Sequence, residues 1–382
     1  MGSSLRGSVA ITGLGSFGVG QTPGWSAMEL MEQAAHRAVI DAGLTMADVD
    51  GLCAATFYHF FPTLSAAEQL GIHPKWSSAD MVGGSSYMNY VTHAAAAIEA
   101  GLCNNVLILY GSNARSSMNL NGLVETPQSE QPWEPMVPLS GYALAASRYL
   151  HEFDATREDF GRVHMAAREW AALNPEAELR DPITISDYLA QRQIAAPFCR
   201  YDCCLLSDGG VALVLSRADR ARDMQQKPVY LLGAGSAHWH REIAQMPDFT
   251  TTAATDSSAR AYAMAGLGPE DIDLVELYDA FTLNVLLFLE DLGFAKKGEG
   301  AGLVRDRVIT PGGRLPVNTN GGGLCHAHPG MYGLICINEA VQQLRGTAGE
   351  RQVDQAETAI AHGNGGTLSH QATLILGSGA TL

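Results

Sequence analysis

A chain of 382 residues, 46% of them hydrophobic and 17% charged, is long enough to bury one large core or two fused ones, and this composition excludes a fibrous or disordered protein. The formal net charge of −16 argues against general binding of polyanions, so we expect no nucleic-acid partner. A substrate that carries phosphates would need a local basic cluster such as Lys296 and Lys297, or scattered arginines.

The cysteines and the first residues bear on the compartment. The seven cysteines form no CxxC pair and no even disulfide framework, so we expect free thiols in a reducing environment. The chain enters a strand without an apolar signal core, and no apolar run approaches the roughly 20 residues of a membrane helix. We therefore expect a cytoplasmic protein without a membrane span.

An internal repeat appears along the chain. Apolar strands predicted at residues 8–16 and 229–236 both end in Gly-x-Gly-Ser, and an Ala-rich helix follows each. Gly266 lies 223 residues after Gly43, and the two glycines share a context: each ends a helix and precedes an acidic loop and a strand. Two similar halves are therefore predicted.

A later pair of elements repeats in the same way. The helix expected at 91–101 with the strand at 105–110 corresponds to the helix at 334–346 with the strand at 358–362. Continuously apolar strands, such as 211–215, alternate with amphipathic helices, which favours β-α-β units and mainly parallel sheets covered by helices.

Between residues 112 and 200 the pattern loosens. Four prolines interrupt it from Pro127 to Pro138, and helices are then predicted at 139–150, 158–172 and 185–195. A long insertion of this kind is either an ordinary helical addition or a segment that covers a binding site.

Four short stretches carry chemical information. They are VGGSSYMNYVTHAAAAIEAG from Val82, ELYDAF from Glu276, NGGGLCHAHPGMYG from Asn320 and HGNGG from His362. Together they resemble the thiolase superfamily over nearly the whole chain, and most closely the sterol-carrier-protein-type thiolases. The nucleophilic cysteine of those enzymes would fall on Gly84 or Ser85 here, so the chain resembles the cysteine-less branch, which includes thiolase-like aldolases that cleave steroid side-chain thioesters.

The resemblance implies an α/β fold of the thiolase type. Two fused βαβαβαββ halves would form a five-layer αβαβα sandwich with a helical loop-domain insertion. Residues 1–227 would be the N-terminal half, including a substrate-covering insertion at about 112–200, and residues 228–382 the C-terminal half. The helix at 139–150 would then lie near the acyl group or a dimer interface.

The resemblance also implies a catalytic set of Tyr278, Tyr332 and His328. The histidine would polarise a thioester carbonyl. A phenol, whose ordinary pKa is about 10, can donate a proton or a hydrogen bond to a developing enolate. For either tyrosine, a buried aromatic with a satisfied hydroxyl is the alternative. Asp279, which follows Tyr278, is expected to brace the segment.

Glycine-rich turns supply the expected substrate-binding positions, because they let the backbone approach a ligand and offer N–H donors. These positions are Gly84, Ser85, Gly322, Gly323, Asn364 and Gly365. A tight turn without a ligand is the alternative for each of them. Cys325 lies on the side of the His-Pro loop where the resembled enzymes have no nucleophile, so we expect a small apolar residue there.

We expect neither a metal nor a bound cofactor, with a CoA thioester as substrate. His326 and His328 lie two residues apart beside Cys325, but no further ligand motif accompanies them. The favoured function is retro-aldol cleavage of a bulky, steroid-like β-hydroxyacyl-CoA without a covalent acyl-enzyme. A thiolase-type acyltransferase and a non-catalytic acyl-CoA or lipid-binding subunit are the alternatives.

The resemblance implies two kinds of partner. One is a second copy of the chain, in a homodimer formed through the strand near residues 106–112. The other is a small protein with a zinc ribbon and an OB-type fold, which would complete a heterotetramer.

Overall fold

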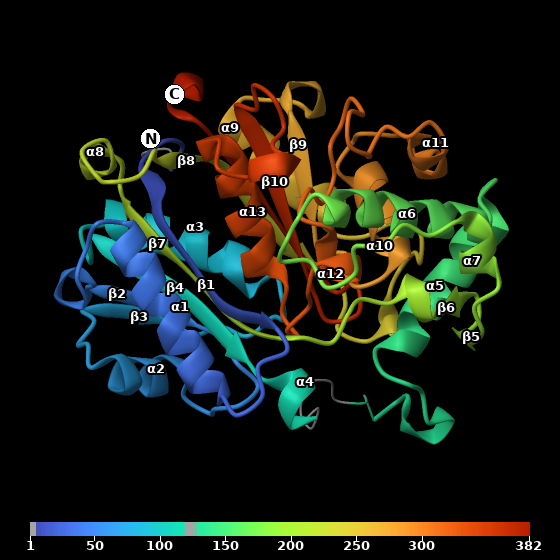
Figure 1. Ribbon diagram of the computed structural model, residues 1–382, viewed down its shortest axis with the longest axis horizontal. Helices are drawn as coiled ribbons and strands as arrows, with labels where there is room; N and C mark the ends of the chain where they lie inside the picture. The colour runs from blue at the N-terminus through green and yellow to red at the C-terminus, as the bar shows by residue number, and fades with distance from the viewer. Residues whose placement is uncertain (1–4, 119–125, 127) are drawn as a thin grey trace.

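The computed structural model describes residues 5–118, 126 and 128–382. Nine strands form one mixed sheet in the order β3-β2-β4-β7-β1-β8-β11-β10-β9 (Figure 1). The order β2-β4-β7-β1 on one side of the β1–β8 junction matches β9-β10-β11-β8 on the other, so the strand order repeats between the two parts of the chain. β1 and β8 meet through the antiparallel pairs Ala10–Tyr230 and Ile11–Val229.

The elements of the first part, up to the insertion, are β1 (Val9–Gly20), α1 (Ala27–Asp41), β2 (Gly51–Ala54), α2 (Pro62–Leu70), β3 (Trp76–Ser78), α3 (Ser86–Glu99), β4 (Asn105–Ser112) and α4 (Ala114–Ser117). Those of the insertion and the returning strand are α5 (Leu139–Glu152), α6 (Arg157–Ala172), α7 (Ile185–Leu189), β5 (Gln193–Ala195), β6 (Phe198–Cys199), β7 (Asp208–Arg217) and α8 (Ala218–Ala221). Those of the second part are β8 (Val229–His238), α9 (Ala254–Ala265), β9 (Leu274–Leu277), α10 (Thr282–Asp291), α11 (Gly300–Arg305), α12 (Gly322–Cys325), α13 (Gly333–Arg345), β10 (Thr358–Gly365) and β11 (His370–Gly377).

The layers are those expected of a thiolase fold. Helix α1 packs on β1, β4 and β7, and α9 packs on β8 and β11, so each helix covers one outer face. Helices α3 and α13 contact each other and strands from both parts of the sheet, and they form the middle layer (Figure 1). Helices α5, α6 and α7 of the insertion gather at one end of the molecule (Figure 1).

The repeated Gly-x-Gly-Ser motif has a packing explanation. A side chain at Gly13 would overlap the carbonyl oxygen of Ala38 on α1, and one at Gly233 would overlap that of Ala261 on α9. The second glycine of each motif meets its covering helix in the same way. The covering helix therefore rests directly on the strand backbone, and only glycine leaves room for it at these positions.

Strand direction departs from the prediction of mainly parallel sheets. β7 runs antiparallel to β1 and β4, and β11 runs antiparallel to β8 and β10. Parallel pairing joins β2 to β3 and β4, and β9 to β10. That prediction was wrong because strands covered by helices on both faces are continuously apolar in either direction, so hydrophobicity does not reveal how they pair.

Two smaller expectations also need correction. The helix predicted at 185–195 ends at Leu189, and strand β5 follows at Gln193–Ala195. The strand proposed for a dimer edge, β4, is internal, since it pairs with both β2 and β7. The edge on that side is β3, while the β9 edge is covered by backbone bonds between Val275 and residues 316–318.

The close helix–strand packing predicts a sharp difference between two glycine substitutions. Gly233→Ala is expected to destabilise the protein by about 1–3 kcal/mol, because the added methyl group would collide with the Ala261 carbonyl oxygen. Gly302→Ala is the control, since an added methyl group there meets nothing within 4 Å in helix α11. Urea unfolding measures both, and equal midpoints would refute the packing explanation.

Candidate functional site

A cavity of about 750 Å³ opens where α3, the end of β9, the His328 loop, the β10–β11 turn and helix α5 meet. Its size suits a large organic ligand. Five of the predicted site residues line it: Gly84, Tyr278, His328, Asn364 and Gly365. Apolar side chains, including Met81, Ile243, Phe281 and Met331, make up much of the remaining wall. The repeat and the motifs thus bring segments nearly 300 residues apart to one cavity.

Gly84 and Tyr278 fit together without spare room. Gly84 lies just before α3, and any side chain on it would overlap the Tyr278 ring at Cε2 and Cζ. The Tyr278 N–H donates to the His362 carbonyl oxygen at 3.0 Å, which fixes the backbone of the residue at the end of β9. The phenol therefore fills the space that a side chain at residue 84 would occupy.

Tyr278 remains a neutral phenol. Burial raises its pKa well above the ordinary value, and its hydroxyl donates to the Gly330 carbonyl oxygen at 3.3 Å. Its ring stands edge-on to those of His328 and Tyr332, with centroids 5.4 and 5.9 Å away. Three aromatic rings thus form one rigid group at the base of the cavity.

His328 is a neutral imidazole with one hydrogen-bonding atom to spare. Burial lowers its pKa to about 4. Its Nδ1 accepts the Gly330 N–H at 3.3 Å, which assigns the ring proton to Nε2. Nε2 has no hydrogen-bond partner within the described part of the chain. His328 therefore carries a buried N–H donor without a partner among the described residues, and its side chain contributes to the cavity wall.

The backbone of His328 is held from behind. Its N–H donates to Ser207 Oγ and its carbonyl oxygen accepts the Ser207 N–H, both at 3.1 Å. Ser207 Oγ in turn donates to Glu178 Oε1 at 2.5 Å, and Arg115 forms an ion pair with Glu178. This reciprocal pair fixes the loop so that the imidazole keeps one orientation.

Four predicted residues do not line this cavity in the described structure. Tyr332 is fully buried behind His328, with its hydroxyl donating to Asn320 Oδ1 at 3.0 Å. The N–H groups of Gly322 and Gly323 donate to Asn320 Oδ1 at 2.7 Å and to Asp279 Oδ1 at 2.6 Å. The expectation that these two glycines offer donors to a substrate is therefore corrected, because protein oxygens already accept both N–H groups.

The fourth of these residues, Ser85, belongs to a pair with a histidine of the wall. His370 Nδ1 lies 2.9 Å from Ser85 Oγ, and its Nε2 lies 3.3 Å from Asn89 Nδ2. An amide nitrogen only donates, so His370 Nε2 accepts and Nδ1 carries the proton. His370 thus donates to Ser85 and cannot remove its proton, which excludes a serine nucleophile in this arrangement.

Asp279 braces the glycine-rich loop, as expected. It accepts the N–H groups of Gly323 and, at 3.3 Å, Leu324, and burial raises its pKa to about 7.

His326, the other histidine of that loop, is buried away from the cavity, and burial lowers its pKa to about 4. Within residues 5–118, 126 and 128–382, no three His, Cys, Asp or Glu side chains are grouped to hold a metal ion.

Comparison with known proteins agrees with this geometry. The family model described as Thiolase C-terminal domain-like matches residues 235–378. The 17-hydroxy-3-oxo-4-pregnene-20-carboxyl-CoA lyase of Mycobacterium tuberculosis is 36% identical over 368 residues, which cover 90% of this chain and 93% of the lyase. An acetyl-CoA acetyltransferase of Methanothermobacter thermautotrophicus is 32% identical over 370 residues, 94% of this chain and 96% of the relative.

A solved structure described as Ltp2-ChsH2(DUF35) aldolase superposes with a TM-score of 0.89 at 34% identity, covering 98% of both chains. The chain belongs to the thiolase superfamily.

The thiolase chemistry of this superfamily needs a thiolate, and the cysteines near the site are poorly suited to supply one. Cys204 lines the cavity, but burial raises the pKa of its thiol far above the ordinary value. Burial does the same to the pKa of Cys325, which lies outside the cavity wall with its Sγ 3.9 Å from His164 Nε2. The expectation for Cys325 as a buried small residue agrees with its position.

Two wall residues were not anticipated as site residues. Tyr142, on α5, packs against Phe281 with ring centroids 4.4 Å apart and ring planes tilted by 33°, and its hydroxyl reaches Asn364 and the β10–β11 turn. His240 follows β8, where Nε2 lies 3.1 Å from the Thr367 carbonyl oxygen. Neither lies in a recognised motif, and the one available signal was the prediction that the helix at 139–150 lies near the acyl group.

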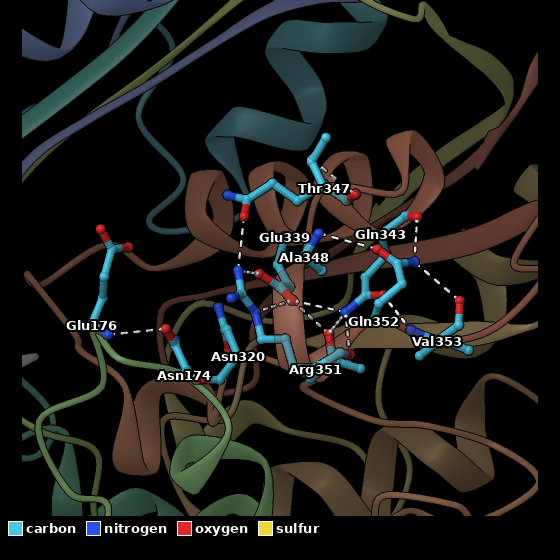
Figure 2. Close-up of polar contacts among 12 residues, drawn as sticks. Asn174, Glu176, Asn320, Glu339, Gln343, Thr347, Ala348, Arg351, Gln352 and Val353 are labelled. Atoms are coloured by element: carbon cyan, nitrogen blue, oxygen red, sulfur yellow. Dashed lines mark hydrogen bonds and ion pairs between the residues drawn. The ribbon is translucent and has the colours of Figure 1, made fainter.

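Behind the aromatic group, a buried polar cluster joins β9, α13 and the loop before the glycine-rich turn. Arg351 Nε and Nη2 donate to the two oxygens of Glu339 at 2.9 Å, and Gln343 Nε2 donates to Glu339 Oε1 at 3.1 Å (Figure 2). Thr319 Oγ1 lies 2.8 Å from Glu276 Oε1 and 2.7 Å from Glu339 Oε1.

One proton cannot serve both of these carboxyl groups. Thr319 has a single hydroxyl hydrogen, so one of the two contacts requires a protonated carboxyl group as donor. Burial raises the pKa of Glu276 well above the ordinary value, while Arg351 compensates the charge of Glu339. Glu276 is therefore the neutral partner, two residues before Tyr278.

The packing of Gly84 predicts an energetic coupling to Tyr278. Gly84→Ala alone is expected to destabilise the protein by about 1–3 kcal/mol, because the methyl group collides with the phenol ring. In a Tyr278→Ala background the same substitution is expected to cost much less, since the ring is gone. A double-mutant cycle from urea unfolding measures the coupling, and additive effects would contradict the close fit.

The neutral state of Glu276 predicts a pH dependence of stability. Its folded pKa is raised, so its contribution to stability is complete below the unfolded pKa of about 4.5 and declines as the pH rises towards the folded value. Glu276→Gln removes this decline and keeps a neutral side chain of the same shape, whose oxygen can still accept the Thr319 N–H. The melting temperature of the variant, relative to wild type, is therefore expected to increase from about pH 5 to about pH 8.

The exposed residue Glu68 on α2 provides the control for this measurement. Glu68→Gln is expected to give a difference that does not change over the same range. If the Glu276→Gln difference were also constant, Glu276 would be ionised in the folded protein.

Proposed function

We propose that this chain is a carbon–carbon lyase that cleaves a bulky, steroid-like β-hydroxyacyl-CoA by a retro-aldol reaction, without a covalent acyl-enzyme. The observation that carries the proposal is the fit of Tyr278 against Gly84, which leaves no room for a nucleophile at that position. The 750 Å³ cavity and its apolar wall support the substrate class. The lyase and the aldolase among the relatives of this chain support it as well.

The reaction moves one proton and one electron pair. The β-hydroxyl loses its proton, its oxygen forms a carbonyl group, and the Cα–Cβ bond breaks with its electrons entering the thioester enolate. His328 Nε2–H hydrogen-bonds the enolate oxygen, and the Tyr278 hydroxyl turns from the Gly330 carbonyl oxygen to do the same, so both act where charge develops. A phenol of the wall then protonates Cα, which releases a shorter acyl-CoA and a ketone or aldehyde.

His240 is the base that we assign to the β-hydroxyl. Its Nε2–H donates to the Thr367 carbonyl oxygen, so Nδ1 carries the lone pair, and Nδ1 has no hydrogen-bond partner among the described residues. Burial lowers the pKa of His240, so the ring is neutral and able to accept a proton. His370 does not compete for this role, because both of its ring nitrogens already lie within hydrogen-bond distance of other side chains.

Tyr332 has a positioning role in this scheme. Its ring stacks on His328 with centroids 5.7 Å apart, and its hydroxyl is engaged with Asn320 away from the cavity. It therefore fixes the orientation of His328 and Tyr278 without touching the substrate. Gly84, Asn364 and Gly365 lie in the wall beside them and remain the proposed substrate contacts.

Acyl transfer is the second candidate, favoured by the acetyltransferase among the relatives. It requires an acylated cysteine, and Cys204 is the cysteine that the described cavity wall offers. The raised pKa of Cys204 makes a thiolate scarce near neutral pH, which weighs against this candidate. A subunit that only binds acyl-CoA would show binding without turnover.

Assembly is part of the proposal. We expect a small partner with a zinc ribbon and an OB-type fold, forming a heterotetramer around a homodimer of this chain, and the aldolase complex among the structural relatives supports such a partner. The free edge strand for the homodimer is β3 rather than β4.

Three properties bear on location and on CoA. All seven cysteines are free, which supports the proposed cytoplasmic location. No helix in the described part of the chain has the length and apolar character needed to cross a membrane. Lys297 is not available for CoA phosphates, because its Nζ pairs with Asp291 at 2.6 Å and with Glu290 at 3.1 Å.

The activity is tested with a steroid-type β-hydroxyacyl-CoA, in the presence and absence of the partner protein. Mass spectrometry is expected to detect a shorter acyl-CoA and a carbonyl product, with no acyl group on any cysteine. His328→Ala and Tyr278→Phe are each expected to lower kcat by about 10²–10³-fold, because each removes one donor to the enolate oxygen.

His36 on helix α1 lies outside the cavity wall and serves as the control, so His36→Ala is expected to keep the wild-type rate. An acyl adduct on Cys204 would replace the lyase by the acyltransferase. Tight binding of the acyl-CoA without products, also with the partner present, would favour the non-catalytic subunit.

A further inference from the structure

The wall contains a second phenol whose oxygen is supported differently from that of Tyr278. Tyr142 Oη lies 2.7 Å from Asn364 Nδ2 and 3.0 Å from the Gly366 carbonyl oxygen. A carbonyl oxygen only accepts, so Tyr142 donates to Gly366 and accepts a hydrogen bond from Asn364. The Tyr278 hydroxyl also donates to a carbonyl oxygen, that of Gly330, but the donor that lowers its pKa is the backbone N–H of Tyr332 rather than a side-chain amide.

The Asn364 amide is oriented by a chain of buried side chains. Gln371 Nε2 donates to Asn364 Oδ1 at 2.8 Å, and His362 Nε2 lies 3.0 Å from Gln371 Oε1. At the other end of this series of hydrogen bonds, His362 Nδ1 lies 2.9 Å from Thr373 Oγ1. Since the Asn364 N–H must point to Tyr142, each donor in this chain points the same way, towards the cavity.

This arrangement matters for proton transfer from a phenol. When a phenol gives up its proton, the negative charge stays on its oxygen, and a donor already aimed at that oxygen stabilises the phenolate. Asn364 supplies this donor to Tyr142. Tyr142 is therefore suited to transfer a proton.

We propose that Tyr142 is the catalytic acid that protonates the enolate carbon, with Asn364 as its positioning residue; this inference rests on the proposed lyase function. After Cα–Cβ cleavage, the Tyr142 O–H bond breaks, its proton forms a C–H bond at Cα, and the charge passes to the phenolate oxygen. His240, which took the β-hydroxyl proton at cleavage, gives up that proton and the phenolate takes it, so both groups return to their starting state and no proton is consumed overall.

The protonation step can be measured apart from cleavage. By microscopic reversibility, the group that protonates the enolate also removes a proton from Cα of the short acyl-CoA product. Propionyl-CoA incubated with the wild-type protein in D₂O is therefore expected to gain deuterium at Cα. Tyr142→Phe is expected to slow both this exchange and cleavage by about 10²–10⁴-fold, the usual contribution of a positioned acid.

Two further variants provide a control and a second test of the proposal. Tyr149→Phe, on the same helix, alters a buried tyrosine whose hydroxyl contacts Glu290 at 2.5 Å outside the cavity wall, and it is expected to exchange and cleave at wild-type rates. Asn364→Ala keeps the phenol but removes its donor, so a smaller loss is expected. In the Tyr142→Phe background, Asn364→Ala is expected to add no further loss, whereas independent roles would give additive losses.

The outcomes separate the two proposals. Wild-type cleavage together with full cleavage and exchange in Tyr142→Phe would overturn the role of Tyr142 and leave the lyase intact. Absence of cleavage by wild type, with and without its partner, would refute the lyase and this inference with it. If Tyr142→Phe does not fold, as judged by circular dichroism, the Asn364→Ala variant decides, and an unchanged exchange rate in it overturns the proposal.

Discussion

The fit between Gly84 and the Tyr278 ring is the constraint on which the rest of the site depends. Because a side chain at residue 84 would occupy the space of the phenol, the start of helix α3 can hold either a nucleophile or this ring, and here it holds the ring. The ring in turn supports His328 and Tyr332 by edge-on contacts. The same fit at Gly84 thus excludes a nucleophilic side chain and makes room for a rigid aromatic donor group.

Burial sets the charge state of the groups around Tyr278. It lowers the pKa of His328 to about 4 and raises those of Tyr278 and Cys204, so these three groups are neutral near neutral pH. Neutral donors suit a reaction in which negative charge appears only after a bond breaks. A fixed cation would also stabilise the bound substrate, and stabilisation of the substrate does not accelerate the reaction. Because burial keeps these groups uncharged, they are suited to hydrogen bonding and poorly suited to nucleophilic attack.

The sequence was sufficient for the architecture because the repeat reflects backbone contacts. Gly13 and Gly233 recur since each lets a helix rest on a strand, and such contacts leave a residue signature. Strand direction and the roles of Gly322 and Gly323 could not be predicted in the same way. Apolar runs do not encode direction, and a glycine N–H does not reveal whether a substrate or the Asp279 carboxyl group accepts it. Tyr142 was missed because its partner, Asn364, lies 222 residues away.

That distant pair also explains how the insertion becomes part of the site. The turn between β10 and β11 offers Asn364, which has no proton to give in this chemistry. Its amide instead reaches across to helix α5 and holds a phenol there. In the role proposed for Tyr142 the acid–base group lies in the insertion rather than in the turn, so residues at about 139–150 would contribute to the reaction itself. A change in the insertion would then alter the chemistry together with the acyl group that the cavity admits.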